Sequence, residues 1–280
     1  MNDPVLIIVC FGIACGILLS LIIKRNRKNA LQVKLSTAIP ETWRNMLATQ
    51  VLFYKNLSTP DRLLFEKRVQ LFLATKKVEG IDTDIDDTIK LMVASSAIIP
   101  TFAFPEYNYP HVHVVLIYPN SFDEKFQTQR FEGHKELIMG MVGNRFMDGT
   151  VILSKPDLVK AFDGQPHKEN VGIHEFVHLL DKEDGIIDGV PELLLAHRFV
   201  GPWLHEIKKE MTKIELGTSD INPYALTNNA EFLAVVSEYF FENPEKFERR
   251  HPELYAFLSG IFNHNKNAQL PETNNTEIKQ

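Results

Sequence analysis

The sequence predicts an α+β fold dominated by helices, with a small sheet and one N-terminal transmembrane helix. Three observations support this class. Residues 5–23 form an uncharged apolar run, β-branched strand patterns all precede residue 155, and helical periodicity dominates after it.

The apolar run at residues 5–23 has the length of a membrane span. At about 1.5 Å per residue, a helix of this length covers about 29 Å, close to the thickness of the hydrocarbon layer. Basic residues follow the run and none precedes it. The positive-inside rule therefore predicts a single-pass anchor in the inner (cytoplasmic) membrane, with the body facing the cytoplasm. A cleaved signal peptide is the alternative, but it requires basic residues ahead of the apolar run.

The chain divides into four predicted parts. Residues 1–28 are the membrane anchor with its basic flank, 29–58 a juxtamembrane segment, 59–264 the globular domain, and 265–280 a disordered tail without aromatic residues.

Within the domain, capping residues and prolines mark the expected elements. Thr59 and Pro60 begin a helix that runs to about Lys77, and Pro100 ends a second helix at 84–98. Strands are expected at 112–118 and 151–153, the second after a tight turn at 147–150. Further helices are expected from Pro156 and over 167–182, 191–215, 228–242 and 252–263, with an acidic loop at 183–190.

Charge and cysteine content exclude several kinds of function. The chain has 30 basic and 36 acidic residues, of which four basic and one acidic lie in residues 1–28, so the remainder carries a net charge of −9. Such a body is a poor partner for phosphate backbones, and we expect no direct nucleic-acid binding. Cys10 and Cys15 both lie in the apolar run. Any metal in the body must therefore be bound by His, Asp or Glu.

The sequence His174-Glu175-Phe176-Val177-His178 is an HEXXH motif in a predicted helix. Residues four apart share a helix face, so both imidazoles can reach one ion. Zinc lowers the pKa of a bound water, and the neighbouring Glu175 can accept its proton. These are the parts of a zinc peptidase, with Zn²⁺ as cofactor and a peptide or protein as substrate. An intact Glu175, in a chain that offers these two histidines and one later carboxylate as its obvious ligands, argues against a purely structural zinc.

A catalytic zinc needs a third protein ligand, and two sources are available. Asp184 occupies the last position of one extended HEXXH pattern, but Asp181 replaces the glycine that this pattern requires. The other source is the helix at 228–242, where Glu231 and Glu238 lie seven residues apart on one otherwise apolar face. Both carboxylates are expected to be buried and to need partners.

The segments HEFVHLLD, NPYALTNNAEFLAVVSEYFFENPEKF and HPELYAFL resemble the MtfA family of zinc-dependent peptidases. The similarity is dense over 171–262 and weaker over 55–170. It implies a gluzincin-type, zincin-like metallopeptidase domain in which His174, His178 and Glu231 bind zinc. Asn222 and Asn229 stand where the family more often has Asp and Pro, which affects loops rather than ligands.

The resemblance also implies roles for neighbouring residues. Glu175 would be the general base and Tyr224, seven residues before Glu231, would hydrogen-bond the oxyanion. Asp181 and Glu238 would orient the ligating histidines from behind. The strand at 151–153 is a candidate for aligning an extended substrate by β-addition.

The family was first described as an anti-repressor of a sugar-uptake regulator. A second hypothesis is therefore a binding module that sequesters a transcriptional regulator, with weak or vestigial hydrolysis.

His111 and His113 share one face of a strand start and could suggest a second metal site. No acidic residue accompanies them in sequence, which favours a structural role.

Overall fold

The computed structural model describes residues 38–121, 140–142 and 149–262. The predicted membrane segment at 5–23, its basic flank and the tail at 265–280 lie outside these residues. Within the described part of the chain, no helix combines the length and the apolar character needed to span a bilayer. Residues 1–40 and 41–280 form separate units, and the second contains the elements described below.

Within these described ranges the sheet has four strands, in the order β1-β2-β4-β3. The strands are β1 (Lys77–Gly80), β2 (Val114–Tyr118), β3 (Gly140–Val142) and β4 (Thr150–Ser154). The β1–β2 and β2–β4 pairs are parallel, whereas β3 runs antiparallel to β4, with Gly140 opposite Leu153. The sheet is therefore mixed, and β3 is its edge strand among the described residues.

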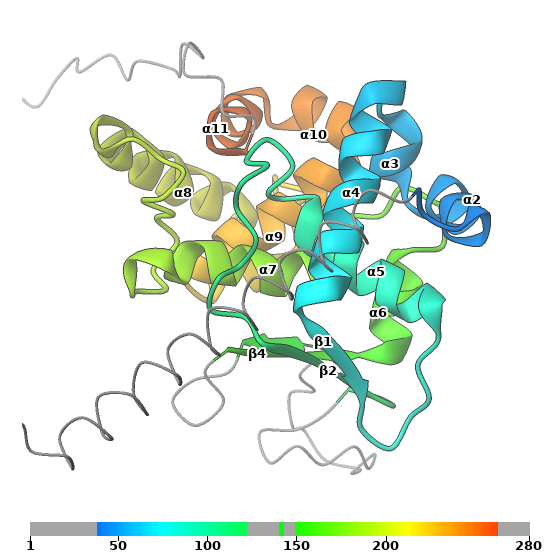
Figure 1. The fold of residues 1–280 in the computed structure, drawn as a ribbon. Helices are drawn as coiled ribbons and strands as arrows, with labels where there is room; N and C mark the ends of the chain where they lie inside the picture. The colour runs from blue at the N-terminus through cyan, green and yellow to red at the C-terminus, as the bar shows by residue number, and fades with distance from the viewer. Residues whose placement is uncertain (1–37, 122–139, 143–148, 263–280) are drawn as a thin grey trace, which may run out of the picture. The chain divides into compact units, whose positions relative to one another are not determined.

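The helices outnumber the strands, which confirms a helix-dominated α+β fold. They are α2 (Glu41–Gln50), α3 (Leu52–Asn56), α4 (Thr59–Thr75), α5 (Asp87–Ile98), α6 (Lys155–Ala161), α7 (Val171–Asp181), α8 (Val200–Glu215), α9 (Asn229–Glu242), α10 (Pro244–Arg250) and α11 (Pro252–Phe262). Short 3₁₀ helices lie at η2 (Lys182–Asp184), η3 (His197–Phe199) and η4 (Pro223–Leu226). In Figure 1, α7 lies on one side of the sheet next to β4, with α9 beside it.

Helix α7 is the central element, and nine of its eleven residues are buried. It begins at the capping residue Asn170, whose Oδ1 accepts the N–H of Ile173 at 3.0 Å. Gly172 lets α7 approach α5 closely, because a Cβ there would lie 2.0 Å from Ser96 Oγ. Helix α9 begins at Asn228, which caps the N–H of Glu231 in the same way at 2.9 Å. Helices α7 and α9 pack against each other.

Several element boundaries differ from the sequence prediction. Ser58 rather than Thr59 caps α4, because its hydroxyl reaches the N–H of Asp61. The chain after α4 enters strand β1 at Lys77, and the region 191–199 consists of turns and η3, so that α8 begins only at Val200. Helices α2, α3 and α10 and strands β1 and β3 were not predicted. These elements are short, and their positions depend on tertiary packing rather than on periodicity.

The predicted role of residues 151–153 in aligning a substrate is wrong. Strand β4 pairs with β2 on one side and β3 on the other, so its backbone hydrogen-bonding groups are occupied within the sheet. Strand β3 takes the edge position instead.

Candidate metal centre

Helix α7 brings the two histidines of the HEXXH motif together. His174 and His178 lie one turn apart on the same face, and their Nε2 atoms are 3.1 Å from each other. His178 is buried and His174 is partly buried. Both rings therefore offer a nitrogen to one point at the surface of α7.

Helix α9 supplies a carboxylate to the same point. Glu231 Oε2 lies 2.9 Å from Nε2 of His174 and 3.4 Å from Nε2 of His178. The ligand atoms of these three residues all lie within 4.8 Å of one another. In the described ranges this is the one group of three or more His, Cys, Asp or Glu side chains that converges in this way.

The opposite side of the His174 ring faces a second carboxylate of α9. Glu238 Oε1 lies 2.7 Å from His174 Nδ1, and Glu238 Oε2 accepts the backbone N–H of Asn170. Because Glu238 follows Glu231 by seven residues, both point from α9 toward α7. A carboxylate on Nδ1 keeps the proton there and leaves the Nε2 lone pair for a metal.

The donor chemistry fits zinc. Two imidazole nitrogens and one carboxylate oxygen converge, and with a water this set completes a tetrahedral catalytic site.

The electrostatics of the ligand group favour a positive charge between the three side chains. Burial alone would raise the pKa of Glu231, but hydrogen bonds from His174 and His178 hold it well below its usual value. Burial would lower the pKa of His174, but Glu238 and Glu231 outweigh burial and raise it.

Glu175 lies beside this group with its carboxylate against the edge strand. A Cβ on Gly140 would lie 2.5 Å from Glu175 Oε1, so only glycine leaves room for the carboxylate in this position. Glu175 is 5% exposed, and burial raises its pKa despite the two neighbouring histidines. A carboxyl group with a raised pKa is suited to proton transfer near neutral pH.

A cavity of about 630 Å³ opens next to these groups. Its lining includes Gly140, His174, Glu175 and Glu238, together with Tyr224 from η4. The Tyr224 side chain is 52% exposed, and its ring centroid lies 6.2 Å from that of His174. The structure therefore brings the predicted base, one predicted ligand and the predicted oxyanion donor to the wall of one cavity.

The two aspartates after the motif lie apart from the ligand atoms. Asp181 is buried at the end of α7, where Oδ2 accepts the N–H of Gly189 at 2.8 Å. Burial raises its pKa to about 6. The Asp181 Oδ1 and His178 Nδ1 atoms are both buried without a hydrogen-bond partner among the described residues, so the orienting role of Asp181 stays a prediction. Asp184 is exposed, and its side chain accepts the N–H of Ile186.

Comparison with known proteins agrees with this geometry. The model of a family described as glucose-regulated metallo-peptidase M90 matches residues 23–263. This chain belongs to that family. The resemblance to the MtfA family seen in the sequence is thereby confirmed.

Several relatives of this M90 family member align over most of their length. An uncharacterized protein of Synechocystis is 30% identical over 229 residues, 79% of this chain and 82% of the relative. Mlc titration factor A of Escherichia fergusonii is 28% identical over 246 residues, 84% and 90% of the two chains. The protein of the same name from Cronobacter sakazakii is 30% identical over 227 residues, 77% and 83% of the two chains.

Three residues of the site could not be found from the sequence. Asn170 carries only the signal of a helix cap, yet it also joins two carboxylates of α9, because its side-chain Nδ2 donates to Glu242 Oε1 at 2.7 Å. Gly140 lies in a strand too short for periodicity to reveal. Glu242 resembles any polar residue at the end of a helix.

We predict that the metal depends on the three convergent ligands. The full-length protein should bind one zinc per chain. His174→Ala, His178→Ala and Glu231→Ala should each lower zinc content severely, because three ligands are the minimum set of a catalytic site. Asp184→Ala is the matched control and should retain the metal. Zinc measured by elemental analysis after gel filtration tests this, and retention by Glu231→Ala with loss by Asp184→Ala would reverse the assignment.

Glu242 should make stability depend on pH. Burial raises its pKa from 4.5 to about 7, so the folded state holds this proton more tightly than the unfolded chain. The resulting stabilisation is fully present below about pH 4.5 and is lost as the pH rises through about 7, on the order of 3 kcal/mol at most. Glu242→Gln removes the titration and keeps an acceptor for Asn170.

The Tm of Glu242→Gln should therefore exceed that of the parent at pH 8, and the difference should shrink toward pH 5. Glu248→Gln, an exposed change on α10, should show no such trend. An equal Tm difference at both pH values would mean that Glu242 does not titrate in this range.

Proposed function

We propose that this protein is a zinc-dependent metallopeptidase that hydrolyses peptide bonds, with Glu175 as its general base. One observation carries the proposal. The three convergent ligand atoms, the buried carboxylate of Glu175 and a cavity large enough for several side chains lie next to one another. Membership of the M90 family supports the same reaction class.

His174, His178 and Glu231 would hold the zinc. When bound, zinc supplies a Lewis acid that polarises the substrate carbonyl and lowers the pKa of a coordinated water. Glu238 would hold the proton of His174 on Nδ1 and keep the ring in its orientation.

Glu175 would accept the proton of the attacking water and later give it to the leaving amine. Its position supports this role, because Glu175 lines the same cavity as Gly140 and the ligand His174. Its raised pKa brings the carboxyl closer to working pH, where a group can both accept and release a proton.

Tyr224 would donate its hydroxyl to the oxyanion that forms on the substrate. The support is its place on the wall of the same cavity, with its ring near His174. A donor aimed at developing charge lowers the barrier more than it strengthens substrate binding.

An extended substrate would lie along strand β3. This strand is at the edge of the sheet, and its first residue, Gly140, faces Glu175. An edge strand can pair with a peptide through backbone hydrogen bonds, which would place a scissile bond near the base.

A second function is favoured by the names of two relatives. Both are called Mlc titration factor A, which describes titration of a regulator rather than hydrolysis. This chain would then bind a transcriptional regulator as its main role, with or without cleaving it.

Replacing the base should separate catalysis from binding. Glu175→Gln should lower kcat by at least about a hundredfold, because the amide cannot accept the proton, while zinc content and Tm stay near those of the parent. A fluorogenic peptide library identifies a cleaved sequence, and kcat is then measured on it. Glu192→Gln, an exposed change after α7, is the control.

An unchanged kcat in Glu175→Gln would contradict the proposed mechanism, in which Glu175 is the general base. If Glu175→Gln abolishes hydrolysis but the protein still changes the activity of its transcriptional regulator in cells, regulator binding is the function.

The Tyr224 hydroxyl should act only in the transition state. Tyr224→Phe should lower kcat about a hundredfold, on the order of 3 kcal/mol, with little change in KM and one zinc per chain. Tyr255→Phe, which removes a hydroxyl from α11, should be silent. A Tyr224→Phe enzyme with parental kcat would exclude the hydroxyl from the mechanism while leaving the zinc site standing.

A further inference from the structure

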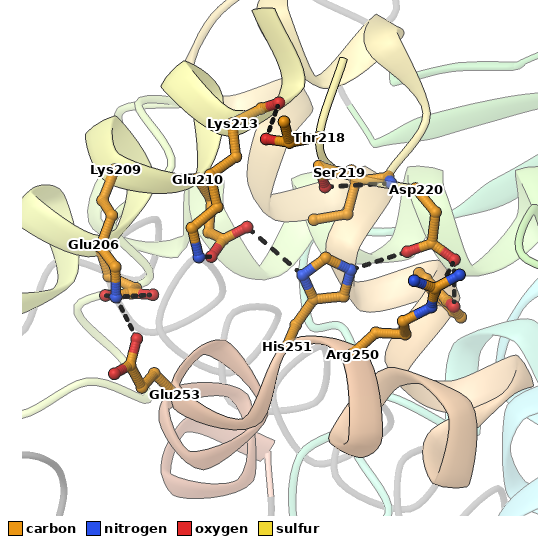
Figure 2. Close-up of polar contacts among 12 residues, drawn as sticks. Glu206, Lys209, Glu210, Lys213, Thr218, Ser219, Asp220, Arg250, His251 and Glu253 are labelled. Carbon is orange, nitrogen blue, oxygen red and sulfur yellow. Dashed lines mark hydrogen bonds and ion pairs between the residues drawn. The ribbon is translucent and has the colours of Figure 1, made fainter. Parts of the chain in front are cut away.

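A second charged cluster lies apart from the metal ligands and is centred on Asp220, in the loop between α8 and η4. Figure 2 shows His251 between Glu210 of α8 and Asp220, with Arg250 beside the same aspartate. Asp220 accepts hydrogen bonds from Lys168 at 2.9 Å and Tyr239 at 3.0 Å, and His251 Nε2 lies 2.8 Å from Oδ1. Lys246 and Arg250 add weaker ion pairs at 3.7 and 3.9 Å.

His251 lies between two carboxylates in this cluster. Its side chain is 5% exposed, and its two ring nitrogens face one carboxylate each, Glu210 at 3.4 Å and Asp220 at 2.8 Å. Burial lowers the pKa of His251, but the two carboxylates outweigh it and raise the pKa. Asp220 is thus bound by donors from three separate segments of the chain: Lys168, Tyr239 of α9, and α10 with its C-cap His251.

The same loop carries Tyr224. We call residues 220–224 the tyrosine strap. Ile221 is buried, and Asn222 Oδ1 accepts the N–H of Tyr224 at 2.9 Å while its Nδ2 donates to Glu169 at 2.8 Å. Lys168 reaches the strap twice, because its Nζ also donates to the backbone carbonyl of Asp220 at 2.6 Å.

The strap therefore has two anchors of different strength. Asn222 holds the end next to Tyr224 through one bond from a backbone N–H and one bond to the Glu169 carboxylate. Asp220 holds the other end through several charge-assisted hydrogen bonds in a partly buried setting. The Tyr224 side chain is half exposed, and its ring lies near that of His174. A displacement of about 1 Å in a catalytic group can cost up to a hundredfold in rate.

We propose that Asp220 is a positioning residue that holds the tyrosine strap, and with it the Tyr224 hydroxyl, in place for oxyanion stabilisation. The proposal rests on the proposed peptidase function and on the role of Tyr224 within it. Asp220 itself contacts neither the ligand group nor the substrate cavity; Lys168, its partner, lines that cavity.

A neighbouring ion-pair network provides a matched control. Lys209 of α8 bridges Glu206 and Glu253, and Figure 2 shows this group on the side of α8 away from Asp220. It joins α8 to α11 but has no contact with the strap among the described residues. Glu253→Gln therefore removes a comparable ion pair without touching Tyr224.

Asp220→Asn is the sharpest test. The amide keeps the shape but offers one acceptor oxygen, so it cannot accept from both Lys168 and His251. In the full-length zinc-loaded protein, kcat on the cleaved peptide should fall about tenfold or more with KM nearly unchanged and one zinc per chain. Glu253→Gln should leave kcat within twofold of the parent.

A double-mutant cycle separates positioning from general stability. In the Tyr224→Phe background, Asp220→Asn should change kcat less than twofold, because the hydroxyl that it positions is absent. Equal losses in both backgrounds would show that Asp220 acts elsewhere and would overturn the proposal. If Tyr224→Phe alone has parental kcat, the proposed role of Tyr224 fails and this inference fails with it.

Hydrogen exchange gives a readout independent of activity. Asp220→Asn should speed amide exchange in the peptide covering 219–227, in the metal-free and metal-loaded protein alike, while exchange in α7 stays unchanged. Lys168→Met removes one of the donors to Asp220 and replaces Asp220→Asn in the test if that variant does not fold. It should show the same faster exchange over 219–227, with a smaller loss in kcat. Parental exchange and kcat in the folded variant would contradict the proposal.

Discussion

Both ring nitrogens of His174 face carboxylates of one helix, and this contact determines how α7 and α9 meet. Glu231 lies at Nε2 and Glu238 at Nδ1, so the imidazole is enclosed along almost two turns of α9. Buried charges are costly unless they are paired, and removing one partner leaves the others uncompensated. The backbone N–H of Asn170, at the cap of α7, also donates to Glu238. The start of the motif helix and the orientation of its first histidine are therefore fixed by the same side chain.

The positions of Glu175 and of the cavity depend on this contact. With α7 held against α9, Glu175 is directed toward Gly140 of the edge strand, and the cavity opens between that strand and η4. Because η4 packs against α9, Tyr224 lines the same cavity as Glu175. Residues of the sheet, the motif helix and the glutamate helix thus all line the cavity.

The sequence predicted the elements whose signals are local. The HEXXH helix shows apolar and polar residues at helical period, and Glu231 and Glu238 stand out as two acidic residues seven apart on an apolar face. What it missed depends on contacts between distant segments. The edge strand β3 is three residues long, and its importance comes from pairing with β4. Asp220 gives no signal in sequence, because its partners lie in three segments that only the fold brings together. The predicted edge role of residues 151–153 failed for the same reason, since strand order is a tertiary property.

The position of the metal tests the central claim most directly. Crystals of the full-length zinc-loaded protein should give an anomalous difference peak at the zinc edge, about 2.0–2.1 Å from Nε2 of His174 and of His178 and about 2.0–2.2 Å from a Glu231 oxygen. Glu238 should remain hydrogen-bonded to His174 Nδ1 and should not enter the coordination sphere. A peak coordinated by Asp184 or by Glu238 in place of Glu231, or no peak between the two histidines, would contradict the account.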